Sequence, residues 1–127
     1  METVRIRIPA SPSYIHVLRL VAAGLASRLG FTIDEIEDLK IAVDELSAYL
    51  TGAQGRDGTL SIAFAVSGTA ITITGTGDVA PGERIRTDLT EFSRMILDTV
   101  VDSASLDQPD GVPTFTLTKS KQLAGSA

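Results

Sequence analysis

The sequence predicts an α+β fold, a two-layer α/β sandwich in which one mixed sheet carries its helices on a single face. Two observations lead to this prediction. Short runs rich in β-branched residues are separated by segments with the spacing of amphipathic helices, in the order β-α-α-β-β-α-β. With 127 residues, of which 43% are apolar, the chain is also long enough to bury one core without disulfides or metals.

The first half of the chain begins with a strand and continues with helices. Apolar and charged residues alternate over Val4–Ile8, which is the period of a half-buried strand. Apolar residues at spacings of three and four predict one helix over Ser13–Leu29 and another from Ile33 to about Leu50. Thr32 and Glu35 have the spacing of a capping box, which fixes the expected start of the second helix.

The second half of the chain begins with a predicted hairpin. Its strands, Leu60–Ser67 and Ala70–Thr74, are rich in β-branched residues and are joined by a tight turn. Glycines and prolines then predict a loop over Gly75–Thr87. Apolar spacing predicts a third helix from Asp88 to about Ala104, and Val112–Thr118 is the last predicted strand.

The composition excludes several classes of function. Because the chain has no cysteine, disulfides, a cysteine-bound zinc ion and a thiol nucleophile are ruled out. The single histidine, His16, disfavours a histidine-rich metal site, so no metal is expected. With a net charge of −5, the chain lacks the excess of basic residues that is typical of a nucleic-acid-binding protein. An acidic chain can still bind a basic protein partner.

The chain is predicted to form one domain over residues 1–121 with a flexible tail over residues 122–127. Its longest apolar run, Leu20–Ala26, is too short to span a bilayer, so no membrane contact is expected. The opening residues, Met-Glu-Thr-Val, lack the pattern of a signal peptide. We therefore expect a soluble cytoplasmic domain.

A stripe of residues runs along the second helix beside its apolar face. Asp38, Ala42, Glu45 and Tyr49 are spaced by four, three and four residues, so they share one side of the helix. A carboxylate in the middle of such a stripe could act as a general base that faces a cleft. Such spacing more often belongs to a solvated helix face, and the pattern alone leaves both interpretations open.

The run Glu37-Asp-Leu-Lys-Ile-Ala-Val-Asp-Glu45, preceded by Leu29-Gly-Phe31, resembles the anti-sigma-factor serine kinases of the histidine-kinase-like (Bergerat-fold) ATPase superfamily. The similarity continues to Val100-Val-Asp102 and Phe115-Thr-Leu-Thr-Lys119. This resemblance implies the histidine-kinase-like ATPase fold and a role in bacterial stress-response transcription. Members of the family bind ATP and magnesium between helices and sheet, and they phosphorylate a serine of an anti-anti-sigma protein.

The resemblance also implies that the catalytic and metal-binding positions are only partly kept. Glu45 matches the glutamate that acts as the base in the family. Tyr49 stands where the family has an asparagine that helps to coordinate magnesium. A neutral phenol is a poor ligand for this cation, which demands oxygen ligands in tight octahedral geometry. Glu45 is therefore expected to be a vestigial base.

The nucleotide-binding positions implied by the resemblance are altered as well. Gly75 replaces the aspartate that accepts from the adenine amino group, whereas Gly77 keeps the following glycine. Asp78 could substitute only if the loop is rearranged. Glu91 and Ser93 stand at a glycine pair where backbone amides approach phosphate. The resemblance thus implies a degenerate member that has no kinase activity and needs no cofactor.

The partner-binding side of the family is better preserved. Arg19 matches an arginine that contacts both the sigma factor and the competing anti-anti-sigma (STAS) protein, and His16 and Tyr14 are its neighbours. Arg19 could also be an ordinary solvated arginine. The alternatives to a degenerate anti-sigma factor are an active ATP-dependent serine kinase and a regulatory domain that serves another partner. Family members commonly dimerise through their sheet, so a homodimer is also possible.

Overall fold

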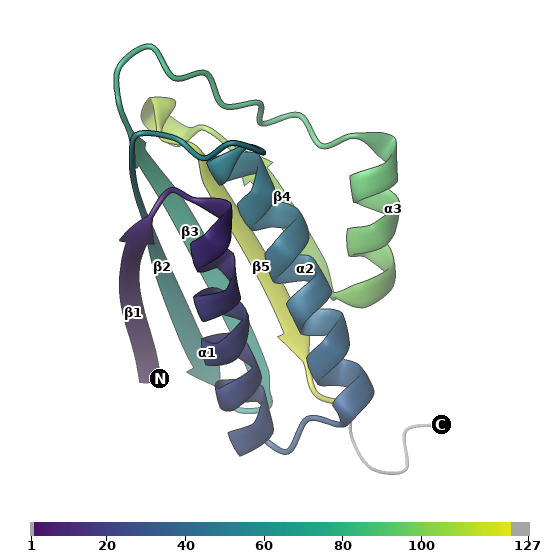
Figure 1. Ribbon diagram of the computed structural model, residues 1–127. Coiled ribbons are helices and arrows are strands. Elements are labelled where there is room, and N and C mark those ends of the chain that lie inside the picture. Colours follow the sequence, from purple (N-terminus) through teal and green to yellow (C-terminus); the bar gives the residue numbers. More distant parts are fainter. Residues whose placement is uncertain (1, 123–127) are drawn as a thin grey trace.

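The computed structural model describes residues 2–122, and the predicted tail lies outside this part of the chain from residue 123 onward. Helices and strands follow one another along the chain as shown in Figure 1. In chain order these elements are β1 (Glu2–Pro9), α1 (Ile15–Arg28), α2 (Ile33–Thr51), β2 (Gly58–Ser67), β3 (Ala70–Val79), α3 (Glu91–Val100), β4 (Ser103–Asp107) and β5 (Thr114–Ser120). Short 3-10 turns precede α1 and join β4 to β5.

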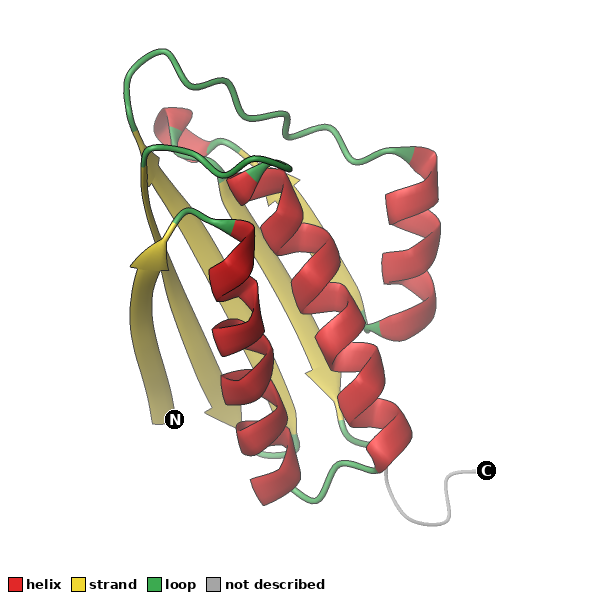
Figure 2. Ribbon diagram, in the orientation of Figure 1, coloured by secondary structure: helices red, strands yellow, loops and turns green. Residues whose placement is uncertain are grey.

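The predicted two-layer α+β sandwich is confirmed. The sheet has five strands in the order β1-β2-β3-β5-β4, and α1 and α2 lie side by side against one of its faces. The third helix, α3, packs beside α2 at the β4 side of the sheet, on the same face (Figure 2). No described element covers the opposite face, where threonines of β3 and β5 stand next to one another.

The prediction of a mixed sheet is wrong, because every pair of neighbouring strands is antiparallel. The reason is a strand that the sequence reading missed. The predicted third helix runs to about Ala104, whereas α3 ends at Val100 and Val101 already has an extended backbone. The chain then forms β4 over Ser103–Asp107 and turns back into β5. This extra reversal makes β5 antiparallel to β3, and without it the two strands would run parallel.

The predicted loop over Gly75–Thr87 is also wrong at its start, because β3 continues to Val79 and pairs with β2 along its whole length. Glycines are depleted in strands, which explains the wrong prediction. The structure supplies a reason for Gly75 within the strand. A β-carbon added at Gly75 would collide with the ring of Phe115 and with the end of the Ile62 side chain. The absence of a side chain therefore lets the Phe115 ring lie directly against β3.

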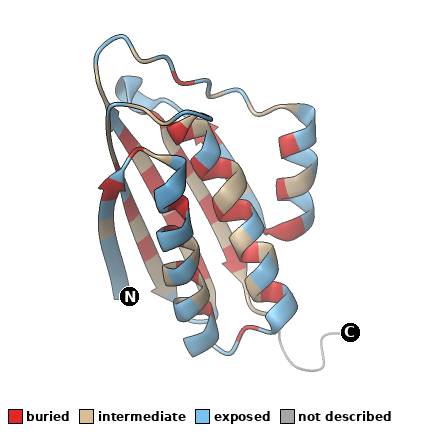
Figure 3. Cartoon of the chain, in the orientation of Figure 1, coloured by how far each residue is buried: buried red, intermediate tan, exposed pale blue. Residues whose placement is uncertain are grey.

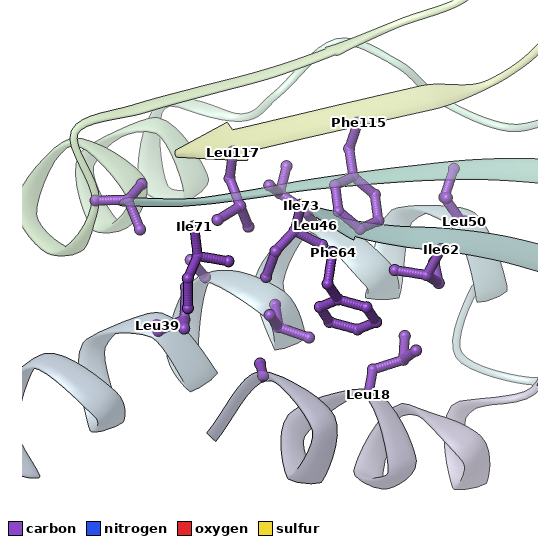
Figure 4. Packing of buried hydrophobic residues seen from close by; sticks show 14 of the residues in the cluster. Leu18, Leu39, Leu46, Leu50, Ile62, Phe64, Ile71, Ile73, Phe115 and Leu117 are labelled. Carbon is purple, nitrogen blue, oxygen red and sulfur yellow. The ribbon is translucent and has the colours of Figure 1, made fainter. Parts of the chain in front are cut away.

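The hydrophobic core lies between the sheet and the helices. Along β2, β3 and β5, residues alternate between buried positions that face the helices and less buried positions on the open face (Figure 3). Phe64 and Phe115 from the sheet meet Leu18 of α1 and Leu46 of α2, and all four side chains are fully buried (Figure 4). This packing fixes α2 on the sheet. It therefore determines which way the other side chains of α2 point.

The capping box predicted at the start of α2 is present. Thr32 Oγ1 accepts from Glu35 N at 3.1 Å, and Glu35 Oε1 accepts from Thr32 N at 2.7 Å. The second carboxylate oxygen, Glu35 Oε2, accepts from Gln122 N at 2.7 Å, which ties the end of β5 to α2. The backbone N–H groups of Gln122 and Thr32 hold the pKa of Glu35 below its ordinary value of 4.5, and burial opposes them only in part.

Replacing Glu35 by Gln is expected to lower the free energy of unfolding at neutral pH. A carboxyl group whose pKa is lowered by folding contributes stability above its unfolded pKa, and this contribution is lost as the pH falls through the folded pKa. Chemical denaturation between pH 7 and pH 2 should therefore show the native chain and Glu35→Gln converging below about pH 4.5. A difference that stays constant over this range would contradict the assignment.

A second prediction concerns the contact between Gly75 and Phe115. Gly75→Ala should lower the free energy of unfolding by about 1–3 kcal/mol, because the added methyl group overpacks the core. Gly77→Ala is the matched control on the same strand, since its β-carbon would make only ordinary contacts at 3.7 Å or more. It should change stability by less than about 0.5 kcal/mol. Equal effects of the two substitutions in urea denaturation would refute this role of Gly75.

Candidate functional site

The polar stripe on α2 faces other parts of the protein. Ala42 is fully buried, and Asp38, Glu45 and Tyr49 are half-buried. The carboxylate of Asp38 lies 3.9 Å from Lys119 Nζ on β5, and Tyr49 and Glu45 point toward the first turn of α3. The stripe is therefore solvated only in part: the Asp38 side chain is 41% exposed, whereas Glu45 and Tyr49 face α3.

A chain of hydrogen bonds joins α3 to α2 at this place. Thr90 N donates to Tyr49 Oη at 3.1 Å, and Tyr49 Oη donates to Ser93 Oγ at 2.8 Å. Ser93 Oγ in turn donates to Glu45 Oε2 at 2.6 Å, the short length typical of a hydroxyl bound to a carboxylate. We call these four residues, Glu45, Tyr49, Thr90 and Ser93, the α2–α3 network.

The local sequence explains why Ser93 is held so firmly. Thr90 is the N-cap of α3: its backbone is extended, and its hydroxyl accepts from Ser93 N at 3.0 Å. The Thr90 hydroxyl also donates to Ser93 Oγ at 3.0 Å. Ser93 is 3% exposed, so the first turn of α3 places its hydroxyl in the protein interior facing α2.

The segment between β3 and α3 is fastened to the end of α2. Arg56 Nε donates to Leu50 O at 2.9 Å, where it satisfies a free carbonyl of the last turn of α2. The same guanidinium donates through Nη1 to Arg84 O at 2.9 Å. Gln108 Nε2 holds the next residue of the segment by donating to Ile85 O at 3.0 Å. Residues 80–90 are thus bound at their middle by Arg56 and at their end by the α2–α3 network.

The structure brings together only part of the predicted nucleotide site. Glu45 and Tyr49 are joined through Ser93, as described above. Gly75 and Gly77 are buried in β3 on the helix side of the sheet, Gly75 beneath the ring of Phe115. Asp78 belongs to the open face, where its carboxylate lies 3.4 Å from Arg7 Nη2 and is 79% exposed. Because β3 continues past Asp78, this carboxylate points away from α2.

The predicted partner-binding residues lie on and just before α1. The Arg19 side chain is 35% exposed, and its Nε lies 3.1 Å from Asp44 Oδ1 on α2, without hydrogen-bond geometry. Burial raises the pKa of Asp44 above its ordinary value, and the Arg19 charge opposes this only in part. His16 is exposed one turn earlier, and Tyr14, immediately before α1, is 43% exposed. Asp44 was missed by the sequence reading.

Within residues 2–122, no helix is long and apolar enough to cross a membrane. In the same part of the chain, no three His, Cys, Asp or Glu side chains are arranged to hold a metal ion.

Known proteins are similar to this chain over part of its length. No protein-family model matches the sequence. The serine-protein kinase RsbW of Bacillus subtilis (strain 168) is 41% identical over 68 residues, which cover 51% of this chain and 42% of that protein. RsbW of Bacillus pumilus is 39% identical over 71 residues, covering 52% of this chain and 44% of that protein. The chain is thus similar to RsbW serine-protein kinases over about half of its own length.

This similarity confirms the resemblance to the anti-sigma serine kinase family, and it is strongest over short stretches. RsbW of Bacillus velezensis is 51% identical over 45 residues, or 35% of this chain and 28% of that protein. The matched stretches thus span less than half the length of the RsbW proteins.

The α2–α3 network predicts a measurable contribution of the Tyr49 hydroxyl to stability. Tyr49→Phe keeps the ring but removes one donor and one acceptor, so it should lower the free energy of unfolding by about 1–3 kcal/mol. Tyr14→Phe is the matched control, because Tyr14 is 43% exposed to water. It should change stability by less than about 0.5 kcal/mol. If thermal denaturation gives Tyr49→Phe and Tyr14→Phe the same stability, this structure of the network is contradicted.

Proposed function

We propose that the chain is an anti-sigma regulator that binds a sigma factor, an anti-anti-sigma (STAS) protein, or both, and that its degenerate ATP site has no kinase activity. The observation that carries this proposal is the hydrogen bond of 2.6 Å between Ser93 Oγ and Glu45 Oε2. Glu45 is the residue that matches the base of the family, and here one of its two carboxylate oxygens, Oε2, accepts from a hydroxyl of the same chain.

The residues at the family's nucleotide positions do not fit a magnesium nucleotide. The hydroxyl of Tyr49 is bound to Ser93, and a phenol is a weak ligand for magnesium. Gly75 has no side-chain acceptor for an adenine, and the ring of Phe115 takes the space that a side chain there would need. Glu91 begins α3, so a phosphate at this helix end would meet a negative charge. These features support a protein that works by binding.

The exposed side of α1 and α2 supports a protein partner. The Arg19 side chain is 35% exposed, and its Nε lies 3.1 Å from Asp44 Oδ1. Next to Arg19, Leu20 is 59% exposed, and Ile41, one turn before Asp44, is 42% exposed. Apolar side chains around an arginine are typical of the energetically dominant part of protein interfaces. We propose that this surface, with His16 as a neighbour, contacts the partner.

The main alternative is an active serine kinase that phosphorylates an anti-anti-sigma protein with ATP. It would require Tyr49 and Asp78 to act from positions other than those described above. A regulatory domain that serves an unrelated partner is the second alternative. A homodimer through the open face of the sheet, which no described element covers, is compatible with each of these functions and belongs to the proposal.

The first test of this proposal is a calorimetric titration of the native chain with magnesium-ATP. We expect no binding at micromolar concentrations, because the Tyr49 hydroxyl is hydrogen-bonded to Ser93 and the Ser93 hydroxyl is hydrogen-bonded to Glu45. RsbW of Bacillus subtilis, titrated under the same conditions, serves as the comparison. Saturable micromolar binding to the chain, or transfer of phosphate to an anti-anti-sigma protein, would favour the kinase.

The second test concerns Arg19 and uses the sigma factor that co-purifies with the chain from its native cells. Arg19→Glu should weaken binding by about 2–5 kcal/mol, because a carboxylate would replace a buried guanidinium at the interface. Arg28→Glu is the matched control, since it makes the same charge change at the exposed end of α1. It should change affinity by less than about 0.5 kcal/mol. Unchanged affinity of a folded Arg19→Glu variant would move the interface elsewhere.

A further inference from the structure

Helix α3 carries two large apolar side chains at its surface. Three of the four phenylalanines in the chain are buried, whereas Phe92 is 66% exposed. Met95, three residues later, is 60% exposed. Residues three apart lie next to one another on a helix, so these two side chains form one apolar surface, which we call the α3 patch. Phenylalanine and methionine are enriched where proteins bind one another.

The buried side of α3 determines where this patch lies. Ser93 is hydrogen-bonded to α2, and Leu97, on the same side of the helix, is fully buried in the core. At about 100° per residue, Phe92 lies about 100° around the helix from Ser93, and Met95 lies about 200° from it. The α3 patch is therefore turned away from the core, and no element of residues 2–122 covers it (Figure 2).

Acidic side chains border the α3 patch. Glu91 and Asp98 are exposed and lie four residues before and three residues after Met95, which places all three on one side of the helix. Arg94, the single basic residue of α3, is directed toward the edge of the sheet, because its Nη1 donates to Ala104 O of β4 at 3.0 Å. The charge next to the patch is therefore negative.

We propose that the α3 patch binds a basic amphipathic helix of a partner protein. Apolar side chains of the partner helix cover Phe92 and Met95, and lysines or arginines on either side of them pair with Glu91 and Asp98. With 10 residues, α3 presents about 15 Å of helix to the partner. The net charge of −5 favours the approach of a basic partner. This inference does not rest on the proposed function, since the patch lies on a different helix from Arg19.

The test uses the full chain and a synthetic helical peptide of about four turns, with leucines at helical spacing and lysines on both sides of them. The chain has no tryptophan, so one tryptophan placed among the leucines reports only on the peptide. We expect saturable binding that moves its fluorescence to shorter wavelength, and the amide resonances of α3 should shift more than those of β1. A matched peptide with glutamates in place of the lysines should bind at least about tenfold more weakly.

Two double variants separate the apolar and the charged parts of this surface. Phe92→Ser with Met95→Ser should weaken binding of the basic peptide at least about tenfold, as expected for the loss of two central contacts of an interface. Glu91→Gln with Asp98→Asn should weaken it about threefold at low salt, and this difference should disappear at high salt. All four side chains are exposed, so circular dichroism should show that both variants remain folded.

The controls make the same changes at exposed positions outside α3. Ile33→Ser with Val112→Ser is the matched apolar control, because the two residues are 78% and 41% exposed. Glu2→Gln with Asp110→Asn is the matched charge control, since both residues are exposed. Both control variants should leave the affinity for the basic peptide unchanged.

The proposal is overturned if the basic peptide does not bind, if the acidic peptide binds equally well, or if the apolar control weakens binding as much as the variant of the α3 patch. It is also overturned if Phe92→Ser with Met95→Ser converts a dimer into a monomer in analytical ultracentrifugation, because the patch then binds a second copy of the chain. Magnesium-ATP binding by the native chain would overturn the proposed function and leave this proposal standing.

Discussion

One buried hydroxyl joins the first turn of α3 to α2. Ser93 is bound by the N-cap residue of its own helix and by Tyr49 and Glu45 of α2, so it is the point at which the helices meet through polar atoms. A buried polar network of this kind stabilises one arrangement, because a hydroxyl left without partners in the interior is costly. The contact therefore holds the first turn of α3 against α2 and takes up one carboxylate oxygen of Glu45, while Leu97 and Val100 bury the rest of the helix in the core.

A second constraint acts from the sheet side. The ring of Phe115 lies against β3 where Gly75 has no side chain, and it is fully buried in the core that α2 covers. Gly75, the position that the resemblance aligns with an aspartate of the family, is thus part of the packed core in this chain. Gly75 has no side-chain acceptor, and Glu45 Oε2 is hydrogen-bonded to Ser93. These two features lie in different layers of the fold, and the proposed loss of nucleotide binding rests on both.

Much of the fold could be predicted from local patterns, and the errors have physical causes. The capping box at Thr32 and Glu35 located α2 because its signal lies within one turn. The strand β4 was missed because Ser103–Asp107 is short and polar and is stabilised by pairing with β5, a contact distant from the local sequence pattern. At the site, Glu45 and Tyr49 were identified from helix spacing. Their bond to Ser93 joins residues more than forty positions apart, and the Thr90–Ser93 capping pair was its only local signal.

The central claim is that the chain's own hydroxyls occupy Glu45. A high-resolution crystal structure of the protein grown in excess magnesium-ATP tests this claim most directly. The account predicts that Ser93 Oγ remains within hydrogen-bond distance of Glu45 Oε2, near the present 2.6 Å, with Tyr49 bound to Ser93. Electron density for a nucleotide between α2 and β3, with α3 displaced and Glu45 turned toward the metal or the phosphates, would contradict it.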